Sequence, residues 1–263
     1  MKKVIILFIF LSIFLVALAD EVKKPVAILG YGGPITAVEY RIFKPESIEY
    51  KVFDDWLQPS EYYNFSVIYM AERIGQLPTV KENKGNMWTD PEVLKKVEEY
   101  LKSGGVIIIT CCAFDGLAEG RNLGAISHLL GFGYYPRYPR GKSPYKVKIV
   151  NKKSPITAHL KKEEYDWIAD TTPISNVSSA EVLAVQVDEN GEVLSPFITE
   201  NIIGKGKVYW FGTPLFRLYQ KKQLDPEVEE YRNTLFQAIL QGNPARGEIK
   251  KEKWEPIPLG GKK

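Results

Sequence analysis

The chain has 263 residues, of which 44% are hydrophobic and 12% aromatic, enough to bury one sizeable core. Its 35 Lys and Arg residues nearly balance its 32 Asp and Glu residues, which leaves a formal net charge of +3. Such a balance creates no strong field toward nucleic acid or an anionic membrane, so neither is an expected partner.

The first residues have the pattern of a secretory signal peptide. Two lysines precede a run over residues 4–18 that is apolar except for Ser12, and a small residue follows it before Asp20. This order predicts that residues 1–19 are cleaved from an exported chain, which would be secreted or periplasmic. Retention of the segment as a membrane anchor stays open, although the run is short for crossing a bilayer. We expect no membrane contact once the segment is removed.

Strand and helix signals alternate in the first half of the mature chain. Short apolar runs predict strands over residues 25–30, 48–53 and 66–70. A helix is predicted from Asp90 to Ser103, because Asp90 suits the N-cap and Pro91 the first helical position. Val106–Thr110 follows as an apolar run without alternation, which is typical of a strand covered on both faces. This order predicts an α/β fold with a doubly wound, mostly parallel sheet.

The second half is richer in strands and closes with a helix. Strands are predicted over residues 145–150, 180–188 and 207–212. The closing helix opens with Asp225 and Pro226 and ends at Gly242. Residues 243–263 are rich in Pro, Gly and Lys and are predicted to form an irregular tail. We therefore expect one α/β domain over residues 20–242, followed by the tail.

Cys111 and Cys112 directly follow the strand Val106–Thr110, at a place where a nucleophile could sit. They are the only cysteines of the chain, and a disulfide between such neighbours would be strained. No Cys or His pair has the spacing of metal ligands, so neither a metal nor another cofactor is expected. The alternative to a nucleophile is a small apolar residue at the end of a buried strand. A thiol also needs a neighbouring base or a positive field to become a thiolate at neutral pH.

Four stretches between residues 94 and 215 resemble one family of proteins. They are LKKVEEYLKSGGVIIIT, LLGF, SPITAHL and GKGKVYWFGTPL. In this order they are similar to class I glutamine-amidotransferase-like domains, in particular to the secreted trehalose-utilisation (ThuA-like) relatives and to the trimerisation domain of certain β-galactosidases. The resemblance covers most of residues 25–241 and implies a flavodoxin-like, doubly wound scaffold.

The same resemblance implies where a catalytic triad would stand. Cys111 is nearest to the nucleophile position of active amidotransferases. Their base is a His two residues before a Glu, just past a late strand, and Thr213 and Leu215 occupy those places here. Neither side chain can take a proton from a thiol at neutral pH. His128 and His159 are the only histidines, and each is interpreted as a helix-face or loop residue. The resemblance therefore favours a chain that is not an enzyme.

A ligand site is predicted beyond the carboxyl ends of the strands, where open α/β sheets bind their ligands. Three loops would meet there: a Gly-rich turn, the segment after the two cysteines and the segment after residues 207–212. Their candidate ligand-binding residues are Tyr31, Gly32, Gly33, Asp115, Glu119, Arg121, Thr213 and Arg217. The turn could equally be an ordinary strand-to-helix connection, and Asp115 and Arg121 could pair to cap the next helix. The aromatic segment 131–145 is a second candidate, since its rings could stack on a sugar or a partner surface.

Two classes of function follow from these patterns. The first is an exported, non-catalytic module that binds a carbohydrate or a protein, with assembly into a homo-oligomer left open. The second is a sugar-related hydrolase that uses Cys111 or Cys112, or the carboxylates Asp115 and Glu119. The missing His and Glu favour the first class.

Overall fold

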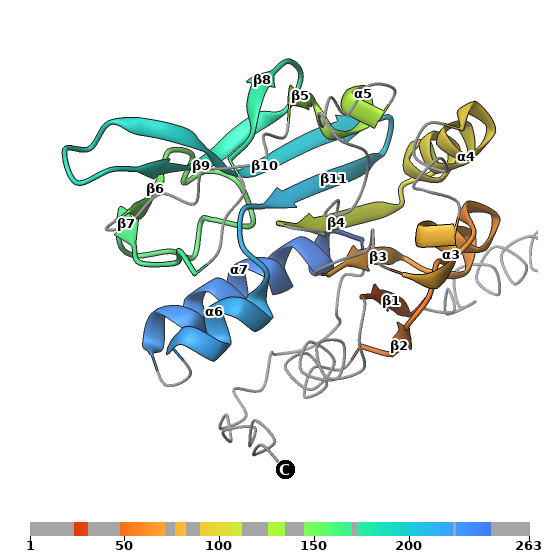
Figure 1. The fold of residues 1–263 in the computed structure, drawn as a ribbon, viewed down its shortest axis with the longest axis horizontal. Helices are drawn as coiled ribbons and strands as arrows, with labels where there is room; N and C mark the ends of the chain where they lie inside the picture. Colours follow the sequence, from red (N-terminus) through yellow and green to blue (C-terminus); the bar gives the residue numbers. More distant parts are fainter. Residues whose placement is uncertain are drawn as a thin grey trace, which may run out of the picture.

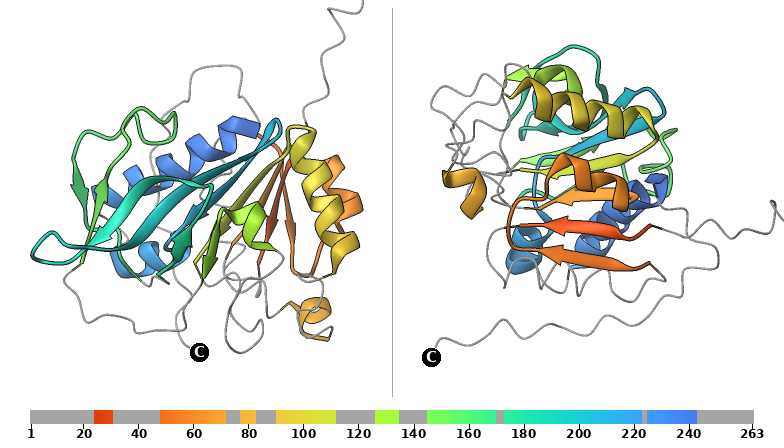
Figure 2. Two further views of the ribbon diagram at one scale, coloured as in Figure 1. Left: turned by 90° about the horizontal axis from the view of Figure 1, so that it is seen from above. Right: turned by 90° about the vertical axis from the view of Figure 1, so that its right-hand side faces the viewer.

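A mixed sheet with helices against both of its faces organises the chain (Figure 1, Figure 2). The computed structural model describes residues 24–30, 48–71, 77–82, 90–111, 126–134, 145–169, 173–222 and 225–242. The elements of the first half are β1 (Val26–Leu29), β2 (Tyr50–Phe53), η1 (Pro59–Asn64), β3 (Val67–Met70), α3 (Pro78–Glu82), α4 (Pro91–Lys102) and β4 (Val106–Thr110). They are followed by α5 (Ser127–Leu130), β5 (Phe132–Tyr134), β6 (Lys146–Ile149), β7 (Glu164–Tyr165), β8 (Ser175–Val177), β9 (Glu181–Val187), β10 (Val193–Ile203), β11 (Gly206–Phe211), α6 (Leu215–Lys222) and α7 (Pro226–Gly242).

Half of the main sheet is parallel. Its described strands lie in the order β2-β1-β3-β4-β11-β10-β9-β6-β7, and those from β2 to β11 run in the same direction. In β4, Ile107 pairs with Ile68 of β3 on one side and with Val208 of β11 on the other. All residues of β4 are buried, which explains an apolar run without alternation. The α/β fold with a doubly wound parallel core is confirmed.

Beyond β11 the sheet continues in antiparallel fashion through β10, β9, β6 and β7. This is the strand-rich second half that the sequence predicts, and β6, β9 and β11 correspond to its three predicted strands. The sequence does not predict β10, which has 11 residues and pairs on both sides. Its register against β9 shifts near Ser195 and Pro196. In the described part of the chain, β5 and β8 form a separate two-stranded sheet.

The two long helices begin at the caps that the sequence predicts. The Asp90 carboxylate accepts a hydrogen bond from the Glu92 backbone N–H at 2.9 Å, and Asp225 does the same for Glu227 at 2.9 Å. Apolar residues of α4 pack with η1 and α5 in one core cluster, whereas those of α6 and α7 belong to the other. The sheet therefore separates α4 from α6 and α7 (Figure 2).

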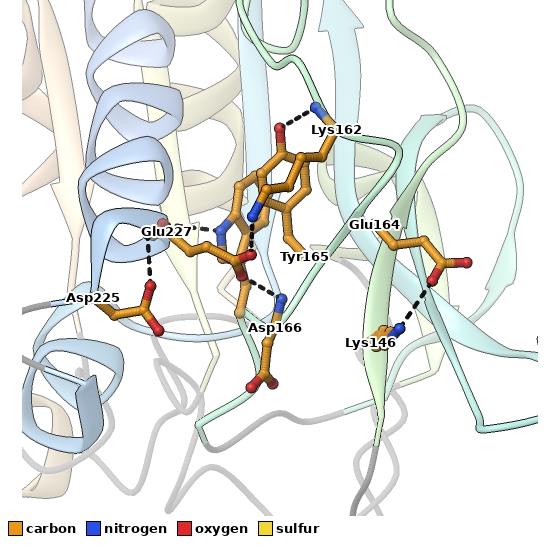
Figure 3. Close-up of polar contacts among 8 residues, drawn as sticks. Lys146, Lys162, Glu164, Tyr165, Asp166, Asp225 and Glu227 are labelled. Atoms are coloured by element: carbon orange, nitrogen blue, oxygen red, sulfur yellow. Dashed lines mark hydrogen bonds and ion pairs between the residues drawn. The ribbon is translucent and has the colours of Figure 1, made fainter.

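A group of contacts around Glu227, here called the Glu227 clamp, fastens the segment after β6 to the start of α7 (Figure 3). Glu227 Oε1 accepts a hydrogen bond from Lys162 Nζ at 2.5 Å, and its Oε2 accepts one from the Asp166 backbone N–H at 2.7 Å. The Trp167 indole Nε1 donates to the Glu227 carbonyl at 3.0 Å. The Trp167 ring also stacks on Tyr165, with ring centroids 4.3 Å apart. One edge of the sheet is thus attached to a helix that lies some sixty residues later in the sequence.

Candidate functional site

The carboxyl ends of the parallel strands meet at one edge of the sheet. The backbone N–H of Cys111, just past β4, donates to the Phe211 carbonyl at the end of β11 at 2.8 Å. On the other side of β4, the Ala71 N–H after β3 donates to the Leu29 carbonyl at the end of β1 at 2.8 Å. The strand ends from which the predicted loops depart are therefore neighbours, as the topology requires.

The Cys111 side chain lies inside this edge. Cys111 is 0% exposed, and so is Thr110, the residue before it. The Thr110 hydroxyl has no hydrogen-bond partner among the described residues. A buried hydroxyl beside a buried thiol was not expected from the sequence, where Thr110 is only the last β-branched residue of an apolar run. A reagent or substrate has no direct access to Cys111 in this arrangement.

The place where the resemblance puts a catalytic base is also buried. Thr213 and Leu215 are each 0% exposed, and Leu215 begins α6. The Tyr231 hydroxyl of α7 donates to the Thr213 carbonyl, which fixes this turn from the opposite side. Tyr231 is a contributor that sequence reasoning did not identify, because its partner is a backbone atom 18 residues away. The segment after β11 is therefore buried and attached to α7.

Arg217 stands in the first turn of α6, shortly after β11. Its backbone N–H donates to the Pro214 carbonyl at 3.1 Å, and its side chain is half-buried. The segment Gly212–Arg217, predicted as a loop, is thus a short turn followed by the start of a helix. The role of Arg217 and Thr213 in ligand binding stays a prediction.

The two histidines lie in contacts that fit the non-catalytic interpretation. His128 belongs to α5, and its carbonyl accepts a hydrogen bond from the Asn201 side chain at 3.1 Å. His159 Nε2 lies 3.3 Å from the Thr234 hydroxyl of α7. Burial against α7 lowers the pKa of His159, and a hydrogen bond to the Glu230 backbone opposes this in part. His159 thus lies in an exposed turn and contacts α7 through Thr234.

We expect His159 to make the protein less stable as the pH falls. Its pKa in the folded chain lies below the ordinary value of 6.5, so the unfolded chain takes up the proton first as the pH drops. The free energy of unfolding should therefore rise with pH below about 6.5 and gain nothing more from this group above it. Urea unfolding of the wild type and of His159→Gln across pH 5–8 measures the effect.

Subtracting the two pH profiles removes the contributions of other titrating groups. One of these is Glu230, because burial raises its pKa. The Glu230 carboxyl makes the free energy of unfolding fall as the pH rises, at pH values around and above its ordinary pKa of 4.5. Parallel profiles for the two proteins below pH 6.5 would contradict the expectation for His159.

Several predicted site residues lie outside the described part of the chain. They are Tyr31, Gly32, Gly33, Cys112, Asp115, Glu119 and Arg121. The same holds for most of the aromatic segment 131–145, for the leader 1–19 and for the tail 243–263. Their assignments stay predictions.

The described ranges hold neither a cluster of metal ligands nor a membrane-spanning helix. Within them, no three His, Cys, Asp or Glu side chains gather in a way that could hold a metal ion. No described helix combines the length and the apolar character needed to cross a bilayer.

Comparison with known proteins supports the fold. No family model and no curated protein matches the sequence. A solved structure described as a ThuA-like protein from Bacteroides uniformis superposes with a TM-score of 0.59 at 13% identity, covering 85% of this chain and 93% of that one. A cytoplasmic protein of Salmonella typhimurium gives 0.56 at 14% identity, with 84% and 98% covered.

Larger enzymes share the fold over part of their length. A β-galactosidase from a Rahnella strain superposes with a TM-score of 0.53 at 14% identity, over 83% of this chain and 31% of the enzyme. The chain thus spans about a third of the length of the β-galactosidases that it matches. These likenesses confirm, at the level of the fold, the resemblance found in the sequence.

Proposed function

We propose that the chain is an exported binding module of carbohydrate metabolism that has an amidotransferase-like scaffold and no cysteine catalysis of its own. One observation carries the proposal. At the place of the catalytic base stands Thr213, fully buried and held through its carbonyl by Tyr231. Because Cys111 is equally buried, the two described positions at which a nucleophile and a base would stand are both closed to solvent.

The proposed carbohydrate context rests on what similar structures are named. The neighbours include a β-galactosidase and an exo-β-1,4-mannosidase, and the chain matches only 31% and 36% of their lengths. A domain of this size beside a glycosidase can serve recognition or assembly. The ligand of the proposed module is accordingly a sugar, or a protein that handles one. Export in this proposal rests on the leader pattern of residues 1–19.

The absence of cysteine catalysis predicts an unreactive thiol. In a Cys112→Ala variant, Cys111 is the only cysteine, so any labelling reports on it alone. We expect the native variant at pH 6 to react with a thiol reagent at least a hundred times more slowly than the same protein in urea, about the ratio that 2.7 kcal/mol of protection gives. Native Cys111 reacting as fast as the unfolded control would show that the thiol is accessible, and a faster reaction would reveal an activated thiolate and favour the hydrolase.

Ligand binding is tested with a thermal-unfolding screen of the mature chain against mono- and oligosaccharides. A sugar present at 100 times its dissociation constant should add about 2.7 kcal/mol to the free energy of unfolding. Arg217→Ala should then weaken binding of that sugar by roughly 1.5–3 kcal/mol, the scale of a hydrogen bond to a charged group. Lys148→Ala, at an exposed position of β6, is the matched control and should change nothing.

An unchanged affinity in Arg217→Ala would place the site away from the carboxyl edge of the sheet. A screen in which no sugar shifts the transition would leave a protein as the partner of the module.

A further inference from the structure

Two asparagines of the chain carry the acceptor pattern for N-linked glycans, Asn-x-Ser/Thr with a residue other than Pro in the middle. They are Asn176-Val177-Ser178 and Asn64-Phe65-Ser66. The pattern by itself is short, so the surroundings of each copy decide whether it can be modified. The structure separates the two.

The copy at Asn176 is open to solvent over its whole length. Asn176, Val177 and Ser178 are all exposed, with Val177 at 37%. Asn176 and Val177 end β8, and Ser178 directly follows it. Among the described strands, β8 pairs with β5 alone. Opposite Asn176 lies Gly133, so no side chain of β5 covers the asparagine from across the pair.

The backbone at Asn176 has a left-handed conformation, with φ of +53°. Asparagine tolerates this region better than most residues, and this alone would explain its choice at position 176. The backbone conformation at Asn176 does not explain the hydroxyl of Ser178, which the acceptor pattern also requires. Ser178 is anchored through its backbone N–H, which donates to the Gly131 carbonyl at 2.8 Å, while the residue itself is exposed.

The copy at Asn64 differs in the residues after the asparagine. Asn64 is exposed at the end of η1, but Phe65 is only 6% exposed and belongs to the core. The Ser66 hydroxyl donates to the Lys24 carbonyl at 3.0 Å, so the fold already uses the group that the acceptor pattern requires.

We propose that Asn176 is an N-glycosylation site and that its donor is an oligosaccharide carried on a lipid pyrophosphate. The Asn176 amide nitrogen forms a bond to the anomeric carbon of the first sugar and loses one proton, which the departing pyrophosphate can take up. The bond from that carbon to the phosphate oxygen breaks, and the lipid pyrophosphate leaves with the electron pair. No oxidation or reduction takes place. The site rests on the export that the proposed function includes, because donor and transferase act on exported chains.

The position of the site suits a bulky modification. Phe132 of β5 and Ile174 before β8 pack in the same core cluster as α4, on the face of the sheet opposite α6 and α7 (Figure 1). A glycan at Asn176 would therefore project from the α4 side of the molecule. It would leave the helices of the other face uncovered.

The test uses the full chain, with its own leader, produced in a eukaryotic secretory host. Intact mass and peptide mapping before and after treatment with an N-glycosidase locate any glycan. We expect most of the secreted chain to carry one at Asn176, with complete loss in Ser178→Ala, which leaves the backbone at position 176 unchanged. Ser66→Ala is the matched control and should retain the glycan at Asn176.

The same masses separate a failure of the site from a failure of export. A secreted chain that begins at Asp20 and is bare at Asn176, or modified only at Asn64, overturns the glycosylation site and leaves export standing. A retained, uncleaved chain overturns export, and the mature chain placed behind a known leader then tests the site alone. In that arrangement too, a bare Asn176 overturns the proposal and an occupied one supports it.

Discussion

Trp167→Ala is expected to lower the free energy of unfolding by about 3–5 kcal/mol, the usual cost of truncating a buried aromatic residue. Trp167 is 0% exposed and lies between the rings of Tyr165 and Tyr231, at centroid distances of 4.3 and 5.2 Å. Its removal leaves a cavity and takes the indole donor away from the Glu227 carbonyl. The segment after β6 would then lose a main attachment to α7.

Urea unfolding of the variant beside the wild type measures this loss. Glu164→Gln is the matched control, because it breaks only the exposed pair with Lys146, at 3.4 Å in the same segment. That pair should be worth about 0–1 kcal/mol. Trp167→Phe should fall between the two, since it keeps a ring and lacks the indole N–H. If Trp167→Ala costs no more than the control, the Glu227 clamp is unimportant for stability.

Gly206→Ala is expected to cost about 2–3 kcal/mol through overpacking. A Cβ at position 206 would lie 2.2 Å from the Leu101 carbonyl oxygen and 2.3 Å from that of Gly105. Both obstacles are backbone atoms, one in the last turn of α4 and one just before β4, so they cannot move aside as a flexible side chain would. The neighbouring Lys207 N–H also donates to the Gly105 carbonyl at 3.2 Å, which holds the two turns together.

Gly133→Ala is the control for this substitution. A Cβ there would come no closer than 3.8 Å to any other residue that the structure describes, an ordinary contact distance. Its effect should stay within about 1 kcal/mol. Thermal or urea unfolding of both variants gives the comparison, and equal losses would show that the α4 turn yields to the added methyl group.

The elements that the sequence predicts well are those with local signals. Asp90 with Pro91, and Asp225 with Pro226, mark the starts of α4 and α7 because a helix start needs a side-chain acceptor and tolerates a missing N–H. The fully apolar run of β4 predicts a central strand for an equally local reason.

β10 could not be predicted because its polar residues are satisfied only by partners that the fold brings to them, from β11 or from α5. Glu200 is buried and forms an ion pair with Lys207 of β11 at 3.4 Å. The Asn201 amide donates to the carbonyls of His128 and Leu129, at 3.1 and 2.9 Å. Such residues give the strand no apolar alternation, although the folded chain buries it. Pro196 weakens the strand signal further.

For the candidate site, the sequence predicts where the residues stand in the sheet, and the structure shows that they are buried. The strand order places Cys111 and Thr213 at the same edge of the sheet, and the hydrogen bond between Cys111 and Phe211 agrees with this. That Thr213 is held by Tyr231 depends on how α7 packs, which no local pattern encodes. The sequence does not predict α6 for a different reason. The segment after β11 was expected to be a ligand-binding loop at the carboxyl end of its strand.

β11 pairs on its two sides with strands of very different sequence distance, and this sets an order for folding. Val208 pairs with Asn201, just before the turn, and with Ile107, about a hundred residues earlier in the chain. Closing the short hairpin costs less chain entropy than closing the long loop, and hairpins form within about 1–10 μs. We therefore expect β10 and β11 to join first, so that the open edge of β11 becomes the template on which β4 docks. The parallel core, although it holds the earliest strands of the chain, would be the last part of the sheet to close.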